Sequence, residues 1–387
     1  MKILAVGGGS GGHVTPIAAV LKALRQEHES AEFEVWCDKS FYEQTVDKIA
    51  TVDPKIVVRT INSGKLRRYH TLPLWRQLLR LRTIVIPNII DGIKIGTGIM
   101  QSYVRLRKDR PDVIFCKGGF VCLPVGIAAK WLAIPVVLHD SDVHPGLTNR
   151  ILSRSATFIA TGAPLENYSY PVEKARYVGV PTDMQFSPVT PHEVDEAKKS
   201  IGFNAKRPLV VITGGGLGSQ VMNTAVLSVI DELLEVCDVL LIAGSKNYDS
   251  IKHELNSRDT AKFQIKPFVG AEMIDTLKAA DIVVARAGAT TLLELAGLAK
   301  PTIIIPNPYL TGGHQIKNAQ MYEKVGAAVV VDEIRMKAEP HALLDTINAL
   351  VLNKKEMKKL AEAIHQFAKP QAARDTARLI VEAADKQ

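Results

Sequence analysis

Short apolar runs alternate along the chain with longer segments in which apolar residues recur at helical spacing. This alternation is typical of βα units, which build a parallel sheet covered by helices. In the first half the apolar runs predict strands near Ile3–Val6, Phe33–Cys37, Ile56–Arg59, Val113–Cys116, Val136–His139 and Phe158–Ala160. In the second half they predict strands near Leu209–Thr213, Val239–Ile242, Phe263–Ile265, Ile282–Val284, Thr302–Ile305 and Ala328–Val331.

Each half opens with an apolar strand that runs into a glycine cluster, at residues 7–12 and again at residues 214–218. Two copies of this unit predict an α/β protein with two Rossmann-like domains facing a cleft. We expect the domains to span residues 1–182 and 183–365, with a helical tail, 366–387, packed back on the first. The prolines between Pro181 and Pro208 predict a linker there.

The first glycine cluster has the form of a phosphate-binding loop. Backbone amides at a strand–glycine–helix turn bind phosphate groups, because glycine allows close approach and the helix N-terminus is partly positive. Gly7, Gly9 and Gly12 fit the pattern G-x-G-x-x-G, and Asp38 ends the second predicted strand. An NAD-dependent oxidoreductase would show the same pattern. Two features favour another function, namely His13 directly after the loop and the second glycine loop in the other domain.

A more specific pattern follows the predicted strand at Ile282–Val284. Gly288 permits a turn, the amides of the next three residues begin a helix, and Glu294 lies just inside that helix. Free amides suit a diphosphate, and a carboxylate suits the vicinal hydroxyls of a ribose. Alternatively, Glu294 is only a helix N-terminal charge that offsets the helix dipole.

The net charge is unevenly distributed between the two halves of the chain, and this bears on which partners are expected. Up to Thr182 the chain has 24 Lys and Arg against 15 Asp and Glu, so the whole net charge of +8 lies in the first half. Between Pro54 and Ile90 there is no acidic residue. This segment predicts a surface for an anionic membrane, formed by Arg68, Trp75, Arg76, Leu79, Arg80 and Arg82. A solvated charged face is the alternative, and without a recognition motif we expect no nucleic acid partner.

At this point six segments, in order along the chain, resemble the successive motifs of the MurG family of glycosyltransferases. They are GGGSGGHVTP (Gly7–Pro16), KGGFVCLPVGIAA (Lys117–Ala129), HDSDVHPGLTNR (His139–Arg150), GGGLGSQVMN (Gly214–Asn223), ARAGATTLLELA (Ala285–Ala296) and GGHQIKNA (Gly312–Ala319). The resemblance implies a GT-B fold and inverting transfer of N-acetylglucosamine from UDP-GlcNAc to undecaprenyl-pyrophosphoryl-MurNAc-pentapeptide (lipid I). It also implies a peripheral location at the cytoplasmic face of the cell membrane. A related transferase acting on another glycolipid is the alternative.

The resemblance also implies site residues. Gly118 and Gly119 fall in an acceptor-binding loop, Glu294 in the ribose position, Gln315 in a sugar position, and the backbone of Val269 beside uracil. The remaining residues implied at the donor site are Ser10, Gly11, Gly12, Gly216, Ala289, Thr290, Thr291, Leu292 and Leu293.

Three positions depart from the family pattern. Gly216 replaces a serine, Asp142 replaces an asparagine, and Asp183 stands near the position of an arginine that would neutralise the diphosphate. Arg286 is the candidate substitute for that arginine.

Transfer to a sugar hydroxyl requires a base. We nominate His13, whose ordinary pKa lies near working pH, with Asp142 as the rival. No metal site and no cofactor are predicted, because helix N-termini and loop amides are expected to stabilise the departing UDP.

Overall fold

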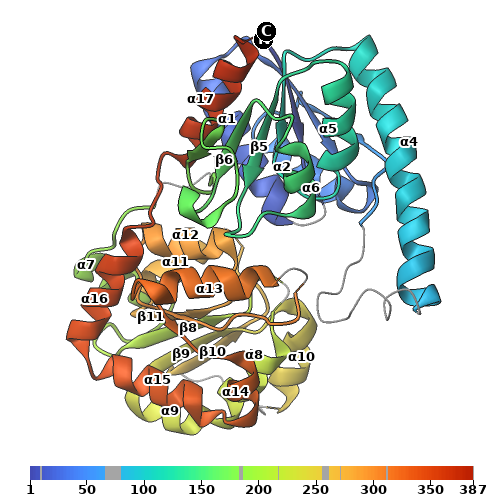
Figure 1. Cartoon of the computed structure of the whole chain (residues 1–387). Coiled ribbons are helices and arrows are strands. Elements are labelled where there is room, and N and C mark those ends of the chain that lie inside the picture. Colours follow the sequence, from blue (N-terminus) through green and yellow to red (C-terminus); the bar gives the residue numbers. More distant parts are fainter. Residues whose placement is uncertain are drawn as a thin grey trace. The chain divides into compact units, whose positions relative to one another are not determined.

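The computed structural model describes residues 1–8, 11–65, 80–182, 186–216, 218–254, 261–270, 272–310 and 313–386 (Figure 1). The chain forms two compact units. The first comprises Met1–Gln185 together with Lys369–Gln387, and the second comprises Phe186–Ala368. The predicted boundaries at residues 182 and 365 therefore each lie three residues from those of the structure.

The first unit is built on a seven-stranded parallel sheet with the strand order β3-β2-β1-β4-β5-β6-β7. Its central strands are buried on both faces, which explains their nearly continuous apolar sequences. The strands are β1 (Lys2–Val6), β2 (Glu32–Cys37), β3 (Val57–Thr60), β4 (Val113–Cys116), β5 (Val136–Asp140), β6 (Phe158–Thr161) and β7 (Ala175–Tyr177).

Helices cover both faces of this sheet. On one face, Ile3 and Ala5 of β1 belong to the same apolar core as Ile17 of α1 and Ile380 of α17, and these two helices lie side by side (Figure 1). On the other face, Leu4 and Val6 pack with side chains of α4 and α5. The helices of this unit are α1 (Gly11–Glu27), η1 (Lys39–Phe41), α2 (Tyr42–Ala50), η2 (Leu81–Val85), α4 (Ile86–Lys108), α5 (Cys122–Trp131), α6 (Leu147–Leu152), η3 (Leu165–Asn167) and α17 (Ala372–Ala384).

The second unit repeats the design with a six-stranded parallel sheet, ordered β10-β9-β8-β11-β12-β13. Its strands are β8 (Leu209–Thr213), β9 (Asp238–Ile242), β10 (Phe263–Lys266), β11 (Ile282–Ala285), β12 (Thr302–Ile304) and β13 (Val329–Val330). Its helices are α7 (Pro191–Ser200), α8 (Gln220–Ser228), α9 (Ile230–Val236), α10 (Ser245–Glu254), α11 (Met273–Ala279), α12 (Ala289–Gly297), α13 (His314–Lys324), α14 (Glu333–Ala338), α15 (His341–Val351) and α16 (Lys354–His365).

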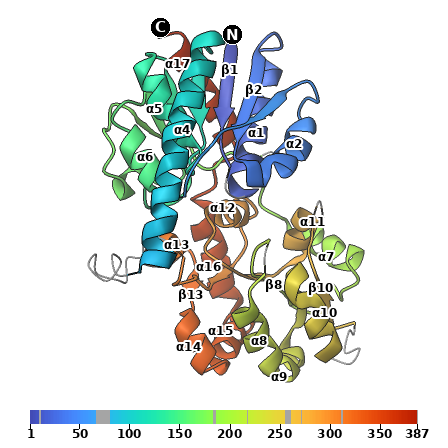
Figure 2. The ribbon, with the colours of Figure 1, turned by 90° about the vertical axis from the view of Figure 1, so that its right-hand side faces the viewer.

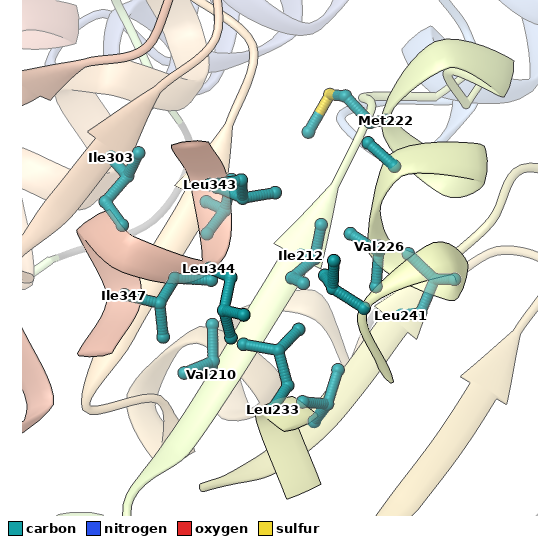
Figure 3. Close-up of a cluster of buried hydrophobic side chains, with 14 of the residues drawn as sticks. Val210, Ile212, Met222, Val226, Leu233, Leu241, Ile303, Leu343, Leu344 and Ile347 are labelled. Carbon is teal, nitrogen blue, oxygen red and sulfur yellow. The ribbon is translucent and has the colours of Figure 1, made fainter. Parts of the chain in front are cut away.

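Alternate residues of β8 serve the two cores of this unit. Val210 and Ile212 point into a cluster that also contains Val226 of α8, Leu233 of α9 and Ile347 of α15, as Figure 3 shows. Leu209 and Val211 point to the opposite face, where α11, α12 and α13 pack. The sheet is therefore buried on both sides, and only its strand ends and their loops are left to contact a ligand.

Every predicted strand is present, and the structure adds β7, which the sequence analysis missed. The predicted linker, Pro181 to Pro208, is wrong in one respect, because it contains helix α7. Thr190 caps this helix in a reciprocal arrangement with Glu193, and Pro191 occupies the first helical position, where proline is tolerated. The proline that suggested a loop is instead a helix start.

Helix α4 has two opposite faces. Asp91, Gly98, Ser102 and Leu106 are buried along one side of α4, and α4 packs against α5 (Figure 2). On the other side an apolar stripe is exposed, consisting of Ile86, Ile89, Ile90, Ile93, Met100 and Val104. The helical stretch Arg82–Lys108 is long and apolar enough to cross a membrane by length and composition alone. Its packing against α5 makes it an integral part of the first unit.

Candidate functional site

Both sheets place glycine loops at the same topological position. The neighbouring central strands are β1 and β4 in the first unit, and β8 and β11 in the second. After one strand of each pair the chain continues toward one edge of the sheet, and after the other strand it continues toward the opposite edge. Parallel α/β sheets bind ligands at the carboxyl ends of such strands. The loops that begin at Gly7, Lys117, Gly214 and Arg286 all lie at these ends.

Helix α12 begins directly after the loop that follows β11. Gly288 is its N-cap, and no side chain caps it. The first intrahelical hydrogen bond is donated by Leu292 N–H to the Gly288 carbonyl oxygen. The amides of Ala289, Thr290 and Thr291 precede that bond, so they are oriented along the helix axis toward an incoming anion.

Glu294 lies one turn further along α12. Burial raises the pKa of its carboxyl to about 7. Within the part of the chain that the structure describes, this carboxyl has no hydrogen bond and no ion pair. No acidic residue stands in the first turn of α12, and stabilisation of the helix dipole fades beyond that turn. The dipole therefore gives a poor explanation for a half-buried carboxylate at this position.

A cavity of about 510 Å³ lies wholly within the second unit, and Arg286, which stands two residues before the N-cap of α12, lines it. It brings together three residues predicted for the donor site, Gly216, Arg286 and Gln315. The side-chain oxygen of Gln315 accepts a hydrogen bond from the backbone N–H of Asn307 at 2.9 Å. Ser219, Asn307 and Glu333 also line the cavity and were not predicted from the sequence. Their positions after strands β8, β12 and β13 are the signal that would have identified them.

Arg286 is held in place by three partners. Its guanidinium donates to the Ile305 carbonyl oxygen at 3.0 Å and to the Ser219 hydroxyl, and it forms an ion pair with the buried carboxylate of Glu333. The guanidinium is thus fixed at the cavity wall. Its charge is partly offset by Glu333, so it supplies less positive potential than an unpaired arginine would.

The other residues predicted to contact the donor differ in what they can offer. The side chains of Val269 and Leu292 lie in the core of the second unit, and Leu293 is also buried. Only the backbone of these three residues is available to a ligand. In the first unit, Gly11 and Gly12 form the first turn of α1, whereas Ser10 lies outside the described residues.

The loop after β4 packs closely on the first glycine loop. Gly118 and Gly119 both have positive φ, 98° and 84°. A Cβ atom at position 119 would lie 2.9 Å from the carbonyl oxygen of Gly8. Only glycine therefore fits this contact, which leaves the backbone of residues 118 and 119 open to a close approach.

His13 lies in the first turn of α1 against that loop. Its imidazole hydrogen-bonds the backbone of Lys117, and burial, with Lys117 second, lowers the pKa of His13 to about 4. At neutral pH the ring is thus uncharged. The pKa is also influenced by Asp142, which raises it. The structure therefore brings the two candidate bases, His13 and Asp142, to the same edge of the sheet as Gly118 and Gly119.

Asp38, the residue that a dinucleotide would use, is engaged locally. Its side chain accepts a hydrogen bond from the Ser40 amide at 3.0 Å and from the Ser40 hydroxyl, and it caps η1. A carboxylate occupied in this way does not favour ribose binding in the first unit. NAD-dependent oxidation is correspondingly not favoured.

The predicted membrane surface is only partly within the described residues. Arg80 and Arg82 are exposed at the start of the helical stretch that leads into α4. Arg68, Trp75, Arg76 and Leu79 lie outside the described residues. The exposed apolar stripe of α4 begins at Ile86, shortly after Arg82, and was not predicted from the sequence.

Comparison with known proteins agrees with this geometry. The chain matches the glycosyltransferase family 28 N-terminal domain over residues 3–161 and the family 28 C-terminal domain over residues 209–376. A relative from Clostridium kluyveri is 34% identical over 358 residues, covering 91% of this chain and 92% of the relative. It is named UDP-N-acetylglucosamine–N-acetylmuramyl-(pentapeptide) pyrophosphoryl-undecaprenol N-acetylglucosamine transferase. A Bacillus thuringiensis relative of the same name, numbered 3, is 33% identical and covers 98% of both chains.

Solved structures show the same fold. MurG of Acinetobacter baumannii superposes with a TM-score of 0.76 at 24% identity, covering 98% of this chain and 99% of that one. A UDP-GlcNAc 2-epimerase from Neisseria meningitidis, bound to UDP-GlcNAc, superposes with a TM-score of 0.65 at 14% identity over the full length of both chains.

The two Rossmann-like units and both family 28 domains define a glycosyltransferase of the GT-B class, as the sequence predicted. Within that class, the chain belongs to the MurG family of N-acetylglucosaminyltransferases.

Proposed function

We propose that this glycosyltransferase moves N-acetylglucosamine from UDP-GlcNAc to lipid I, which forms lipid II in peptidoglycan synthesis. The names of its full-length relatives describe this donor and this acceptor. We assign donor binding to the second unit and acceptor binding to the loops of the first.

Glu294 is the observation that supports the donor assignment most directly. A half-buried carboxyl without a partner is poorly solvated in the unliganded protein, which costs free energy. Two adjacent ribose hydroxyls would donate to it and remove that cost. The amides at the start of α12 would receive the diphosphate, and the cavity with Gln315 would receive the sugar.

The transfer step uses the groups of each unit differently. The acceptor hydroxyl attacks the anomeric carbon while His13 or Asp142 accepts its proton, and the bond to UDP breaks with inversion from α to β. Negative charge develops on the departing diphosphate. The amides of Ala289 to Thr291 are already oriented toward that charge, so they stabilise it without reorganisation. Arg286, offset by Glu333, adds a smaller contribution.

We further propose that the enzyme sits peripherally on the cytoplasmic face of an anionic membrane, where a polyprenyl-linked acceptor is available. The exposed stripe of α4 supplies apolar contact, and Arg80 and Arg82 supply positive charge beside it. An interfacial helix combines these two features.

The donor assignment is tested with Glu294→Ala and isothermal titration calorimetry. Loss of a hydrogen bond to a charged group costs roughly 1.5–3 kcal/mol, so UDP-GlcNAc affinity should fall roughly 10- to 150-fold. Glu323→Ala, which changes an exposed acid on α13, should leave the affinity unchanged. NADH should give no heat of binding with either protein. Equal UDP-GlcNAc affinity in Glu294→Ala and wild type would remove Glu294 from the site.

A further inference from the structure

Lys117 is a buried lysine that the sequence analysis assigned no role. It directly follows β4 and precedes Gly118, and only 1% of its surface is exposed. Its ammonium donates a hydrogen bond to the hydroxyl of Ser141. Burying an ammonium is costly, and a buried titratable group next to a glycine loop is a candidate for a functional role.

The Lys117–Ser141 hydrogen bond joins two loops of the first unit. Ser141 lies between Asp140, the last residue of β5, and Asp142, the rival base. Lys117 lies beside Gly118 and Gly119, the predicted acceptor loop. The β5 side of this contact is itself anchored, because the Tyr170 hydroxyl donates to the Asp140 carboxylate at 2.7 Å.

His13 contacts the same lysine from α1. The imidazole hydrogen-bonds the Lys117 backbone, and a Cβ at Gly119 would lie 3.4 Å from its Nε2 atom. The Nδ1 atom is buried and has no hydrogen-bond partner among the described residues. A neutral imidazole tolerates an Nδ1 atom without a partner, whereas a protonated imidazole would carry an unsatisfied buried N–H donor there.

We propose that Lys117 is a positioning residue, whose buried ammonium fixes the Asp140–Asp142 segment against the acceptor loop and places a positive charge beside His13. The proposal rests on the proposed function, since it assumes that these loops receive the acceptor.

The charged and titratable groups around Lys117 and His13 determine the direction in which each pKa should change when Lys117 is replaced. His13 comes from α1, Asp38 follows β2, His139, Asp140 and Asp142 come from β5 and its loop, and Cys122 begins α5. Lys117 lowers the pKa of His13, of His139 and of Asp140, although burial is the largest influence on each. Burial holds the pKa of Lys117 itself at about 8, and burial raises that of Asp140 to about 7.

Removing the positive charge of Lys117 should therefore raise both the pKa of His13 and the pKa of Asp140. In Lys117→Met, the acidic limb of kcat/KM for the acceptor should move up by roughly one pH unit, the size expected from one nearby charge. The wild type should lose activity as pH rises through about 8, where Lys117 deprotonates. Lys117→Met should lack that alkaline limb.

Lys300→Met is a matched control in the second unit. Lys300 is also buried, its pKa is also lowered by burial to about 8, and its ammonium donates to two carbonyl oxygens at 2.7 Å. Its loss should destabilise the fold, but both limbs of the pH profile should stay in place. A pH shift shared by Lys117→Met and Lys300→Met would mean that destabilisation alone is responsible, and would overturn the proposal.

Two further measurements cover the remaining outcomes. NMR titration of labelled histidine, with His13→Gln to assign the signal, should show a higher pKa for His13 in Lys117→Met, and this needs no transfer activity. An unchanged His13 pKa would refute the proposal.

If Lys117→Met does not fold, Ser141→Ala should lower the pKa of Lys117 and move the alkaline limb of the pH profile to lower pH. An alkaline limb that stays in place in Ser141→Ala would count against the proposal. Absence of transfer by the wild type would instead refute the proposed function.

Discussion

At the scale of single residues, Glu294 and His13 show which properties a sequence reveals. Their positions after glycine loops made them candidates. Their burial did not follow from the sequence, because it depends on residues far along the chain. The pKa of His13 is lowered by packing and by Lys117, more than one hundred positions away in the sequence. Such a contact exists only once β1 and β4 pair.

The two candidate bases, His13 and Asp142, predict opposite results when each residue is substituted in turn. If His13 accepts the proton, His13→Ala should lower kcat by about 10²–10⁴, with little change in UDP-GlcNAc binding. Asp142→Asn should then have the smaller effect on kcat. Steady-state kinetics at saturating donor separates the two variants. Survival of kcat in His13→Ala together with its loss in Asp142→Asn would assign the base to Asp142.

At the scale of elements, periodicity predicted the strands well because buried parallel strands have continuous apolar sequences. It was less informative for boundaries and for faces. Helix α7 was taken for linker, since its capping box and its first-position proline resemble turn signals. In α4, the apolar stripe was not predicted, and the side that is buried carries Asp91, Gly98 and Ser102 beside Leu106. Only packing against α5 shows which stripe stays exposed.

The α4 surface leads to a prediction about membrane binding. Arg80→Glu with Arg82→Glu should weaken binding to anionic vesicles at least roughly 30-fold at low salt, because each basic residue contributes about 1 kcal/mol. Ile89→Ser with Ile93→Ser should weaken it at high salt as well, since apolar contact is not screened. Val172→Ser, at another exposed apolar position, is the control. Vesicle co-sedimentation measures all four proteins. Unchanged sedimentation of both double variants would refute the membrane surface.

At the scale of the whole molecule, the repeated glycine loop was enough to predict two Rossmann-like domains. The strand orders of the two sheets follow the same scheme, and the chain returns to the first unit through α17. The cavity residues Ser219, Asn307 and Glu333 were not predicted, because they belong to separate βα units. They meet only when β8, β11, β12 and β13 lie in one sheet.

The most direct test of the account is the product of the reaction. Purified enzyme would be incubated with UDP-GlcNAc and lipid I in vesicles, and the lipid product analysed by mass spectrometry and NMR. We expect a lipid heavier by one N-acetylhexosamine, joined to MurNAc through a β-linkage, with one UDP released per transfer. Release of UDP without a change in lipid I, or transfer only to a different glycolipid acceptor, would contradict the account.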